Sequence, residues 1–263
     1  MRVRGRRVLL TGASRGLGAA MARALRDRGA ELALVARPSA ALDETAAAVG
    51  GTAYPCDLSD LAAIGPLVDT VEADGPVDIL INNAGVSNVG WFLDRTLDEI
   101  DHVVTLNLLA PLHLCRLVVP GMVERGRGHV VNMSSMAAVI APPGLVAYGA
   151  SKAGLSHATA VMRADLRGEP VTFTVVHLGS VKTDMDDEAR SYGPLRELAE
   201  RSAGRDITPM HQFIAAVMRG IEEDRNEIRV PRMMAPLAAL TNIPRQVSKL
   251  VFSRAPAKEL RSD

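Results

Sequence analysis

The run Asn132–Lys152 holds side chains that can donate, hold or accept protons. Ser135 is followed thirteen positions later by Tyr148, and Lys152 comes four positions after Tyr148. Residues four apart share one face of a helix, so a helix that begins here would place the phenol and the ammonium side by side. A surface tyrosine beside a solvated lysine is the alternative interpretation, and the rest of the chain has to decide between the two.

A glycine-rich turn lies between a predicted strand and a predicted helix near the start of the chain. The short apolar segment Arg7–Leu10 runs into Thr11–Gly18, and an amphipathic helical pattern follows. In this context Gly12 permits a tight turn, Gly16 lets a ligand approach the backbone, and Gly18 lets the helix lie close to the strand. The first N–H groups of the helix then favour a phosphate.

Two arginines lie near the position that a dinucleotide ribose would take. In such a site an acidic residue after the second strand binds the ribose 2′-hydroxyl. Here Arg37 directly follows the predicted strand Glu31–Ala36, and Arg15 lies in the glycine turn. Guanidinium groups pair well with phosphate, so the two favour NADP(H) over NAD(H). Two ordinary surface arginines are the alternative.

Predicted strands and helices alternate along the chain. This order is typical of a doubly wound α/β fold, in which helices flank both faces of a parallel sheet. Near-continuous apolar runs such as Val77–Ile81 fit strands that are covered on both sides. We predict one Rossmann-like domain over residues 1–263, with about seven strands. They are expected over Arg7–Leu10, Glu31–Ala36, Gly51–Pro55, Val77–Ile81, Gly128–Met133, Val171–His177 and Glu227–Val230.

Local signals refine the expected helices. These helices cover Leu17–Arg28, 39–49, Leu61–Glu72, Thr96–Glu124, Tyr148–Arg167 and 209–223. The fourth is expected to break or bend near Ala110–Pro111, and Asn107 inside it is either an idle surface residue or the mark of a kink. Thr208 is the expected N-cap of the last helix, with Pro209 in its first position. Asp57 or Ser59 is the expected cap of the third helix.

Polar and glycine residues follow several of the predicted strands. Parallel sheets of this type bind ligands at the carboxyl ends of their strands. We therefore expect these residues to meet at one edge of the sheet and form a single site. They are the glycine turn, Arg37, Asp57, Asn82–Gly85, Ser135 and Thr183.

Two segments fall outside the alternating pattern. Residues 184–206 are highly charged and are expected to form a helical lid beside the site, with a solvated insertion as the alternative. Residues 231–263 form an extension in which Met233, Leu237 and Leu240 share a helical face among basic residues. This extension is expected to pack on its own domain. A cover over a lipid-like substrate or a membrane-surface segment is the alternative.

Composition narrows the class of protein. The chain has 263 residues, of which 48% are hydrophobic and 23% charged, and this suits one large α/β domain. A formal net charge of zero argues against nucleic acid as a partner. Cys56 and Cys115 lie in apolar runs and are expected to be free thiols. No signal peptide and no apolar stretch of about 18 residues is expected, so cytoplasmic location is the prediction.

Taken together, the motifs resemble the short-chain dehydrogenase/reductase family. The matching stretches are TGASRGLG at 11–18, DL at 57–58, NNAG at 82–85, Asn107, Ser135 and YGASK at 148–152. The resemblance covers about residues 6–183 closely and the remainder loosely. It implies an NAD(P)-dependent oxidoreductase with a Rossmann-like fold.

The resemblance implies a catalytic tetrad of Asn107, Ser135, Tyr148 and Lys152. Tyr148 would exchange a proton with the substrate oxygen. Lys152, together with the positive nicotinamide, would lower the pKa of Tyr148 from its ordinary value of about 10, and Lys152 would also bind the nicotinamide ribose. Ser135 would hold the substrate oxygen, and Asn107 would position a water molecule for proton relay.

Cofactor contacts are also implied by the resemblance. Asp57 would bind the adenine edge, while Asn83 would tie neighbouring strands together. The expected cofactor-binding residues are Gly12, Ser14, Arg15, Gly16, Leu17, Gly18, Arg37, Asp57, Leu58, Asn83, Ala84, Gly85, Tyr148, Lys152, Gly179, Val181 and Thr183.

The chain departs from the family pattern in two places. The pair after the sixth strand is Leu178–Gly179, where the family commonly has Pro-Gly, with Thr183 in register. The extension over 231–263 replaces a short glycine-rich tail and resembles family members that act on steroids, retinoids or other lipids. A homodimer or homotetramer is the expected assembly.

Three loops are expected to line the substrate side of the site. The segments Val86–Phe92, Met136–Val146 and the start of the lid are apolar, and no Arg or Lys in the first two could hold a carboxylate or phosphate. A hydrophobic substrate is therefore expected, although the same side chains could merely pack the loops. The expected substrate contacts are Trp91, Met136, Val139, Leu145 and Met185.

The sequence therefore predicts an NADP(H)-dependent oxidoreductase that interconverts a carbonyl and an alcohol on a small-to-medium hydrophobic substrate. Lipid-, steroid- and ketone-like molecules are the expected substrates, and no metal is expected. The alternatives are a 3-oxoacyl-thioester reductase, a non-catalytic NADP(H)-binding regulator, and a protein that docks on membranes through its C-terminal segment.

Overall fold

The computed structural model of the chain describes residues 3–202 and 207–230, and it describes side chains up to residue 197 and again from residue 207. The predicted extension over 231–263, with Met233, Leu237 and Leu240, lies outside the described residues. The same holds for residues 203–206 of the predicted lid.

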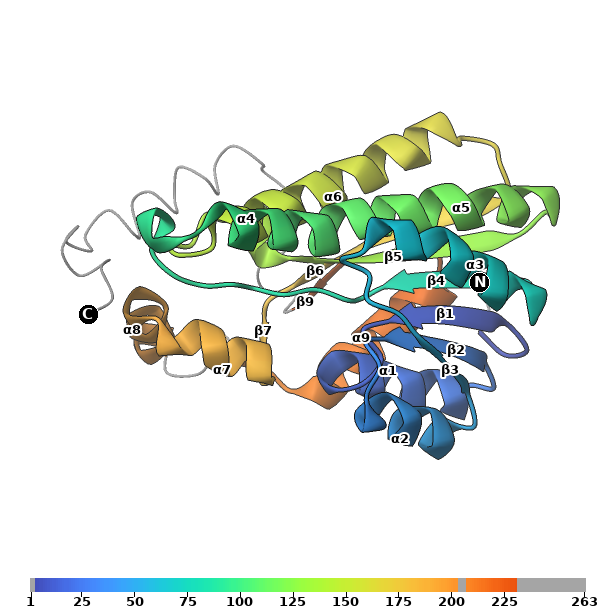
Figure 1. Ribbon diagram of the computed structural model, residues 1–263, viewed down its shortest axis with the longest axis horizontal. Helices are drawn as coiled ribbons and strands as arrows, with labels where there is room; N and C mark the ends of the chain where they lie inside the picture. Colours follow the sequence, from blue (N-terminus) through green and yellow to red (C-terminus); the bar gives the residue numbers. More distant parts are fainter. Residues whose placement is uncertain (1–2, 203–206, 231–263) are drawn as a thin grey trace.

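A seven-stranded parallel sheet forms the centre of the fold (Figure 1). Its spatial order is β3-β2-β1-β4-β5-β6-β9, so the chain builds outward from β1 and then returns to add β4 on the other side of β1. The sheet confirms the predicted Rossmann-like architecture. Its strands are β1 (Arg7–Thr11), β2 (Glu31–Ala36), β3 (Thr52–Pro55), β4 (Ile79–Asn82), β5 (Gly128–Ser135), β6 (Val171–Leu178) and β9 (Glu227–Val230).

Helices cover both faces of the sheet (Figure 1). One layer contains α1 (Gly16–Asp27), α2 (Ala40–Val49) and α9 (Met210–Glu222). The other layer contains α3 (Ile64–Ala73), α4 (Leu97–Val104), α5 (Ala110–Glu124) and α6 (Val146–Asp165). Because the strands are buried on both faces, they can be apolar throughout, as the sequence indicated.

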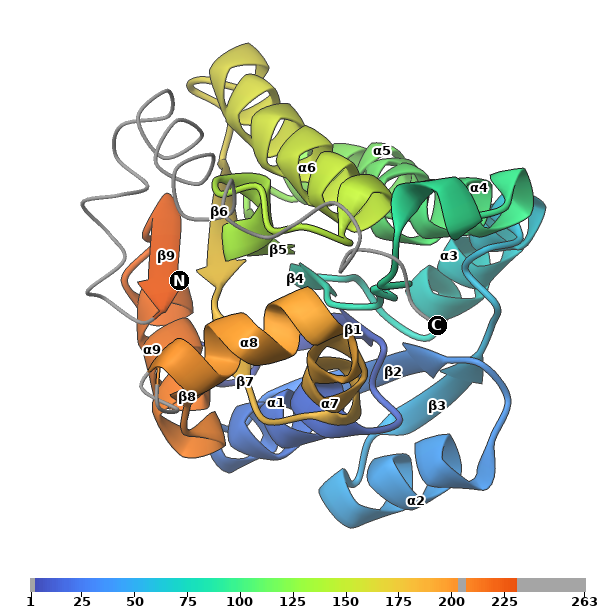
Figure 2. The ribbon, with the colours of Figure 1, turned by 90° about the vertical axis from the view of Figure 1, so that its left-hand side faces the viewer.

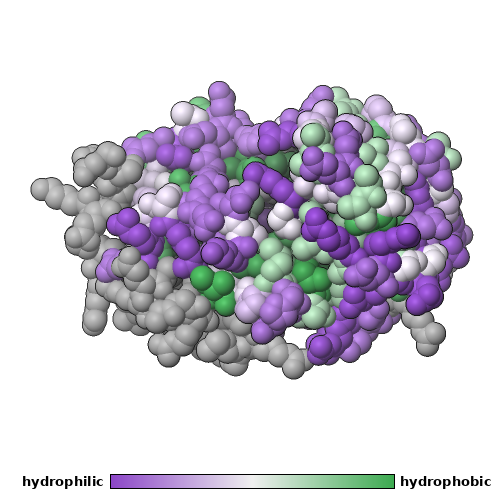
Figure 3. Space-filling model, turned by 90° about the horizontal axis from the view of Figure 1, so that it is seen from below, coloured by the Kyte–Doolittle hydropathy of each residue, from purple (hydrophilic) through white to green (hydrophobic). Residues whose placement is uncertain are grey.

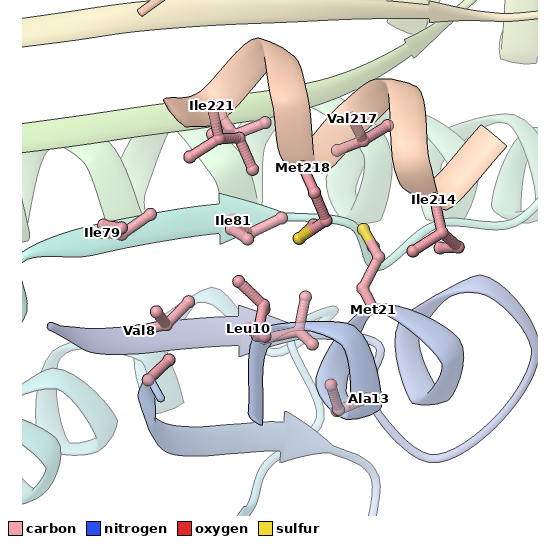
Figure 4. Close-up of a cluster of buried hydrophobic side chains, with 14 of the residues drawn as sticks. Val8, Leu10, Ala13, Met21, Ile79, Ile81, Ile214, Val217, Met218 and Ile221 are labelled. Atoms are coloured by element: carbon pink, nitrogen blue, oxygen red, sulfur yellow. The ribbon is translucent and has the colours of Figure 1, made fainter. Parts of the chain in front are cut away.

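Alternate residues of β1 pack into opposite layers. Val8 and Leu10 join a cluster with Met21 of α1 and Met218 of α9 (Figure 4). Leu9 between them joins the cluster on the other face, which contains residues of α3 and α5. Successive side chains of a strand point to opposite faces, so one short apolar strand joins both halves of the core.

The long helical run between β4 and β5 does not break where the sequence suggested. Pro111 lies at the start of α5, where a proline is tolerated because the first N–H groups of a helix have no partner inside it. The irregularity is instead a π-helical turn over Thr105–Leu109, which contains Asn107. The second of the two interpretations of Asn107, a marker of a kink, is therefore the one that the structure supports.

Two predicted helix caps are wrong. Asp60 rather than Asp57 or Ser59 caps the 3₁₀ turn before α3, by accepting a hydrogen bond from the Ala62 N–H at 3.0 Å. Thr208 belongs to a small strand, β8 (Ile207–Thr208), which pairs with β7 (Ser180–Val181). Its backbone is committed to that pairing, so α9 begins after it, at Met210.

The continuous helical run Leu97–Glu124 is long and apolar enough to span a membrane by length and composition alone, which the sequence analysis did not expect. In the fold, 44% of its most apolar window is buried. Val118 and Met122 of this run lie in the hydrophobic cluster against the sheet. A core helix passes the same test, so the observation is weak evidence for a membrane span.

Two short helices, α7 (Asp184–Ser191) and α8 (Gly193–Ser202), lie beside the carboxyl ends of the strands (Figure 2). They form the segment predicted to be a lid. Figure 3 shows the face below the sheet, where hydrophilic residues cover most of the described surface and small apolar areas show between them. The helices on this side therefore turn their polar faces outward.

Candidate active site

The glycine turn is built so that two of its glycines cannot be replaced without a collision. A Cβ atom on Gly12 would lie 2.9 Å from the Ala84 Cα, and one on Gly18 would lie 2.0 Å from the Gly12 carbonyl oxygen. Gly12 also has a φ of +67°, which favours glycine. Ala84 and Gly18 thus pack directly on the turn, as the motif predicted.

The amino end of α1 points into this turn with its backbone donors free of a side-chain cap. Arg15 is its N-cap residue and makes no capping hydrogen bond, and no acidic residue lies in the first turn. The helix has twelve residues, of which Gly16 and Leu17 are the first two, and Ser14 precedes its N-cap residue. This arrangement fits a bound phosphate, because the unpaired N–H groups and the helix dipole both favour an anion.

The ends of β1 and β4 are joined through Thr11 and Asn83. The Thr11 hydroxyl accepts hydrogen bonds from the backbone N–H groups of Asn83 and Ala84, at 2.9 and 3.0 Å. The Asn83 side-chain amide donates to the Thr11 carbonyl at 2.9 Å. Asn83 therefore has the strand-tying contacts that the resemblance implied, and it also donates to the Gly12 carbonyl in the glycine turn at 3.3 Å.

Asn107 is fully buried, and protein partners occupy its side chain. Its amide oxygen accepts from the Val86 N–H at 3.0 Å, and its amide nitrogen donates to the Val86 carbonyl at 2.9 Å. The same nitrogen donates to the Ser151 hydroxyl at 3.2 Å, and Ser151 in turn donates to the Tyr148 carbonyl at 2.8 Å. Asn107 thus connects the segment after β4 to the helix that carries Tyr148.

Ser135, Tyr148 and Lys152 meet between the end of β5 and the start of α6. The Lys152 ammonium lies 5.9 Å from the centre of the Tyr148 ring, and it donates to the Met133 carbonyl at 2.8 Å. The Ser135 hydroxyl lies near enough to Tyr148 to lower its pKa, and it accepts from the Ala137 N–H at 3.1 Å and donates to the Leu178 carbonyl at 3.4 Å. Helix α6 begins at Val146, so Tyr148 and Lys152 do share a helical face.

Burial shifts the pKa values of Tyr148 and Lys152. Burial raises the pKa of Tyr148, although the nearby Ser135 hydroxyl opposes the rise. Burial lowers the pKa of Lys152 to about 8, because an ammonium loses hydration when it is 5% exposed. The resemblance implied a lowered pKa for Tyr148. The protein alone gives the opposite direction, because burial disfavours the phenolate.

Gly85 lets the backbone pass close to the side chains of the predicted tetrad. A Cβ atom there would lie 2.9 Å from the Asn107 amide oxygen and 3.4 Å from the Lys152 ammonium. The NNAG motif therefore supplies a strand tie at Asn83 and room for the tetrad at Gly85.

Arg37 and Asp57 follow neighbouring strands, and both are exposed. Hydrogen bonds from the Ser59 hydroxyl and N–H hold the pKa of Asp57 below its ordinary value, and the positive charge of Arg37 contributes to this. Leu58 beside it is buried. The two charged residues thus lie near each other at the carboxyl ends of β2 and β3. A site for the adenosine half of a dinucleotide requires such a position.

The segment after β6 lies at the carboxyl ends of the strands, on the side of β1 opposite to β2 and β3. The Gly179 N–H donates to the Val230 carbonyl at 2.7 Å, and Val181 is buried in β7. Thr183 caps α7 by accepting from the Asp186 N–H at 3.3 Å. Its methyl group would lie 4.0 Å from a Cβ on Gly16, so the base of the lid stands opposite the glycine turn.

The predicted substrate contacts are dispersed around the site. Met136 is buried, whereas Trp91, Val139 and Leu145 are half-buried and Met185 is exposed. A small cavity nearby is lined by none of these five. Its walls are Asn88, Gly90, Phe92, Arg95, Glu99, Ile100, Gly144, Val146 and Ala147.

Arg95 is a cation near the substrate side that the sequence analysis missed. It lies outside the loop Val86–Phe92, yet its guanidinium donates to the Asn88 side chain at 2.7 Å and covers Gly90. The loop folds back because Asn88 and Gly90 both have positive φ, at 44° and 157°. The two loops themselves contain no Arg or Lys, as stated from the sequence, but the fold brings the Arg95 guanidinium beside the first of them.

Tyr192 packs the predicted lid segment against the loop between Ser135 and Tyr148. It lies between α7 and α8, is 8% exposed, and packs on Gly144, where a Cβ atom would come within 2.5 Å of its ring. Gly144 belongs to the loop between Ser135 and Tyr148, and its φ is +80°. A second contact joins Ser87 to Glu188 of α7 at 3.2 Å. Sequence patterns offered no signal for these pairings.

Fold and site together define a nicotinamide-dinucleotide-dependent oxidoreductase. The model of the short-chain dehydrogenase family matches residues 6–192. The ketoacyl reductase HetN of Nostoc is 39% identical over 233 residues, which are 86% of this chain and 78% of that protein. A fatty acyl-CoA reductase of Mycobacterium tuberculosis is 36% identical over 262 residues, 95% of this chain and 85% of that protein.

A solved structure gives the same result for the fold. A short-chain dehydrogenase from Streptomyces avermitilis superposes with a TM-score of 0.79 at 26% identity, covering 95% of this chain and 96% of that one. The chain therefore belongs to the short-chain dehydrogenase/reductase family.

Proposed function

We propose that this protein is an NADP(H)-dependent oxidoreductase that interconverts a carbonyl and an alcohol on a hydrophobic substrate. The observation that carries the proposal is the buried Lys152 ammonium beside the Tyr148 ring, with the Ser135 hydroxyl near the same tyrosine. Tyr148 is an acid with a second proton-bearing group, Lys152, beside it. Both lie at the edge of the sheet where a dinucleotide would bind, so they are suited to proton transfer with a substrate oxygen.

The residues at this edge fit the cofactor. The glycine turn and the amino end of α1 would hold its pyrophosphate, and Asp57 with Leu58 would hold the adenine. Lys152 would bind the nicotinamide ribose. Gly179, Val181 and Thr183 would line the nicotinamide side, opposite Gly16. When bound, the cofactor supplies or accepts the hydride.

The catalytic side chains would handle the proton. Ser135 orients the substrate oxygen toward Tyr148, and Tyr148 donates its phenolic proton to that oxygen in the reducing direction. Tyr148 is a protonated phenol at neutral pH, as an ordinary tyrosine is, and its raised pKa leaves it so; it can therefore act as the acid in this direction. Lys152 would stabilise the phenolate that remains.

Asn107 would act by position rather than through its side-chain amide. That amide is committed to Val86 and Ser151, so a water in the proton relay would have to bind elsewhere on the π-helical turn. Its main-chain carbonyl is the group we propose for that water.

Arg37 and Arg15 support NADP(H) over NAD(H). Replacement of Arg37 by aspartate is expected to weaken NADPH binding at least about tenfold, because one charge-assisted pair is lost and a repulsive charge is introduced. NADH binding should change much less, since NADH lacks the 2′-phosphate. Titration of both cofactors against both proteins measures the two dissociation constants, and equal losses would refute the 2′-phosphate assignment.

The pKa of Lys152 predicts how cofactor binding depends on pH. Its protonated form is present below about pH 8 and is lost as the pH rises through that value. If the ammonium holds the ribose, the NADPH dissociation constant should rise by up to about tenfold between pH 7 and pH 9. Lys152→Met should bind NADPH weakly and show no such rise. A flat profile for the unaltered enzyme would exclude this role.

The substrate class is tested by a panel. Oxidation of NADPH and NADH is followed with apolar ketones and aldehydes, and with 3-oxoacyl and acyl thioesters, because two relatives are named as acyl reductases. Turnover of apolar ketones with NADPH supports the proposal, and a preference for thioesters supports the alternative. Cofactor binding without turnover of any substrate would support a non-catalytic regulator.

Assembly and location complete the proposal. We propose a homodimer or homotetramer in the cytoplasm, with 231–263 as the segment that would make any peripheral membrane contact. We also propose that residues 1–263 fold as one domain and that 184–206 act as its substrate lid.

A further inference from the structure

The base of the lid is tied to the cofactor-binding turn by one ion pair. The Arg15 guanidinium lies 2.7 Å from the Asp184 carboxylate, and both side chains are exposed, at 73% and 77%. Arg15 is the N-cap residue of α1, and Asp184 is the first residue of α7. On the basis of the proposed use of NADP(H), we infer that Asp184 determines cofactor preference. Its carboxylate competes with the 2′-phosphate of NADP(H) for the Arg15 guanidinium.

The order of the sheet shows why the two contacts exclude each other. Arg37, which marks the expected position of the 2′-phosphate, follows β2, whereas Asp184 follows β6 and β7. Strands β2 and β6 lie on opposite sides of β1, after which the glycine turn begins. The Asp184 carboxylate therefore draws the Arg15 guanidinium to the β6 side. To reach a phosphate beside Arg37, the guanidinium has to leave Asp184.

Two other contacts of the lid do not involve Arg15. Ser87 donates to Glu188, and Tyr192 packs on Gly144. Neither contact involves a residue of the glycine turn, so the lid keeps both when Arg15 moves. Among the contacts described for α7, only the Arg15–Asp184 pair would be broken when the cofactor phosphate binds Arg15. Asp184 is therefore a positioning residue for Arg15 and not for the lid as a whole.

The expected size of the effect is modest. An exposed ion pair has a small net free energy, so its loss corresponds to a change of about two- to fivefold in a binding constant. Asp184→Asn is therefore expected to tighten NADPH binding by about two- to fivefold. The same change should alter NADH binding by less than about 1.5-fold, since NADH has no phosphate that needs Arg15.

The experiment compares five full-length proteins: the unaltered chain, the single variants Asp184→Asn, Asp187→Asn and Arg15→Gln, and the double variant with both Arg15→Gln and Asp184→Asn. Asp187 lies in the same first turn of α7, so its replacement removes an equal charge without touching Arg15. Each protein is titrated with NADPH and NADH, and quenching of Trp91, the single tryptophan, reports binding. Melting temperatures confirm that each variant folds.

Three outcomes can be distinguished. A rise in the NADPH-over-NADH preference for Asp184→Asn, absent in Asp187→Asn and abolished by Arg15→Gln, supports the inference. Equal behaviour of Asp184→Asn and Asp187→Asn, while Arg15→Gln still loses NADPH preference, overturns the inference and leaves the proposed function intact. If Arg15→Gln does not change the NADPH-over-NADH preference, the assignment of Arg15 to the 2′-phosphate fails as well.

Discussion

Replacement of Tyr148 by phenylalanine is expected to lower kcat by about 10²–10⁴-fold while NADPH still binds. The magnitude is that of a positioned acid or base, because the phenolic proton is the group that the substrate oxygen receives. The aromatic ring and its packing remain, so the fold and the glycine turn should be unaffected. Turnover of the best ketone from the panel and a cofactor titration measure the two quantities separately.

Tyr54→Phe is the matched control for this prediction. The Tyr54 hydroxyl bonds to Arg7 at 2.8 Å and to Asp74 at 2.6 Å, and Arg7 begins β1 at the edge of the sheet opposite to the site. Loss of this hydroxyl should reduce stability by about 1 kcal/mol per lost hydrogen bond and leave kcat unchanged. A Tyr148→Phe protein with normal turnover would overturn the proposed mechanism.

Replacement of Asn107 by alanine is expected to lower the free energy of unfolding by about 2–4 kcal/mol. The change removes three hydrogen bonds and leaves both backbone groups of Val86 without their side-chain partner, each at a cost of about 1–3 kcal/mol. It also removes the link to Ser151, which holds the Tyr148 carbonyl, so kcat should fall too. Urea unfolding measures the first effect and steady-state turnover the second.

Thr105→Ala serves as the comparison. It alters the same π-helical turn, and the Thr105 hydroxyl makes no hydrogen bond with any described residue. This variant should lose less than about 0.5 kcal/mol. If Asn107→Ala were equally stable, the hydrogen bonds through Asn107 would not hold the site together.

Much of the fold was predictable because its signals are local. The alternation of apolar runs with amphipathic segments follows from the geometry of strands and helices, and Val8, Leu9 and Leu10 show it within one strand. The glycine turn was recognisable because Gly12 and Gly18 leave no space for a side chain. The errors fell at helix boundaries, where Asp60, Thr208 and Pro111 took roles set by the chain around them.

The sequence by itself determined the parallel sheet, the glycine turn, and the pairing of Tyr148 with Lys152, because these depend on spacing along the chain and on backbone geometry. The place of Ser135 beside them was implied by the family resemblance. The tertiary structure alone decided the directions of the pKa shifts, since burial of Tyr148 and Lys152 arises only when β5 and α6 pack. It also decided the pairing of Arg15 with Asp184, which lie 169 positions apart. Such contacts depend on how the whole chain packs, and no local pattern encodes them.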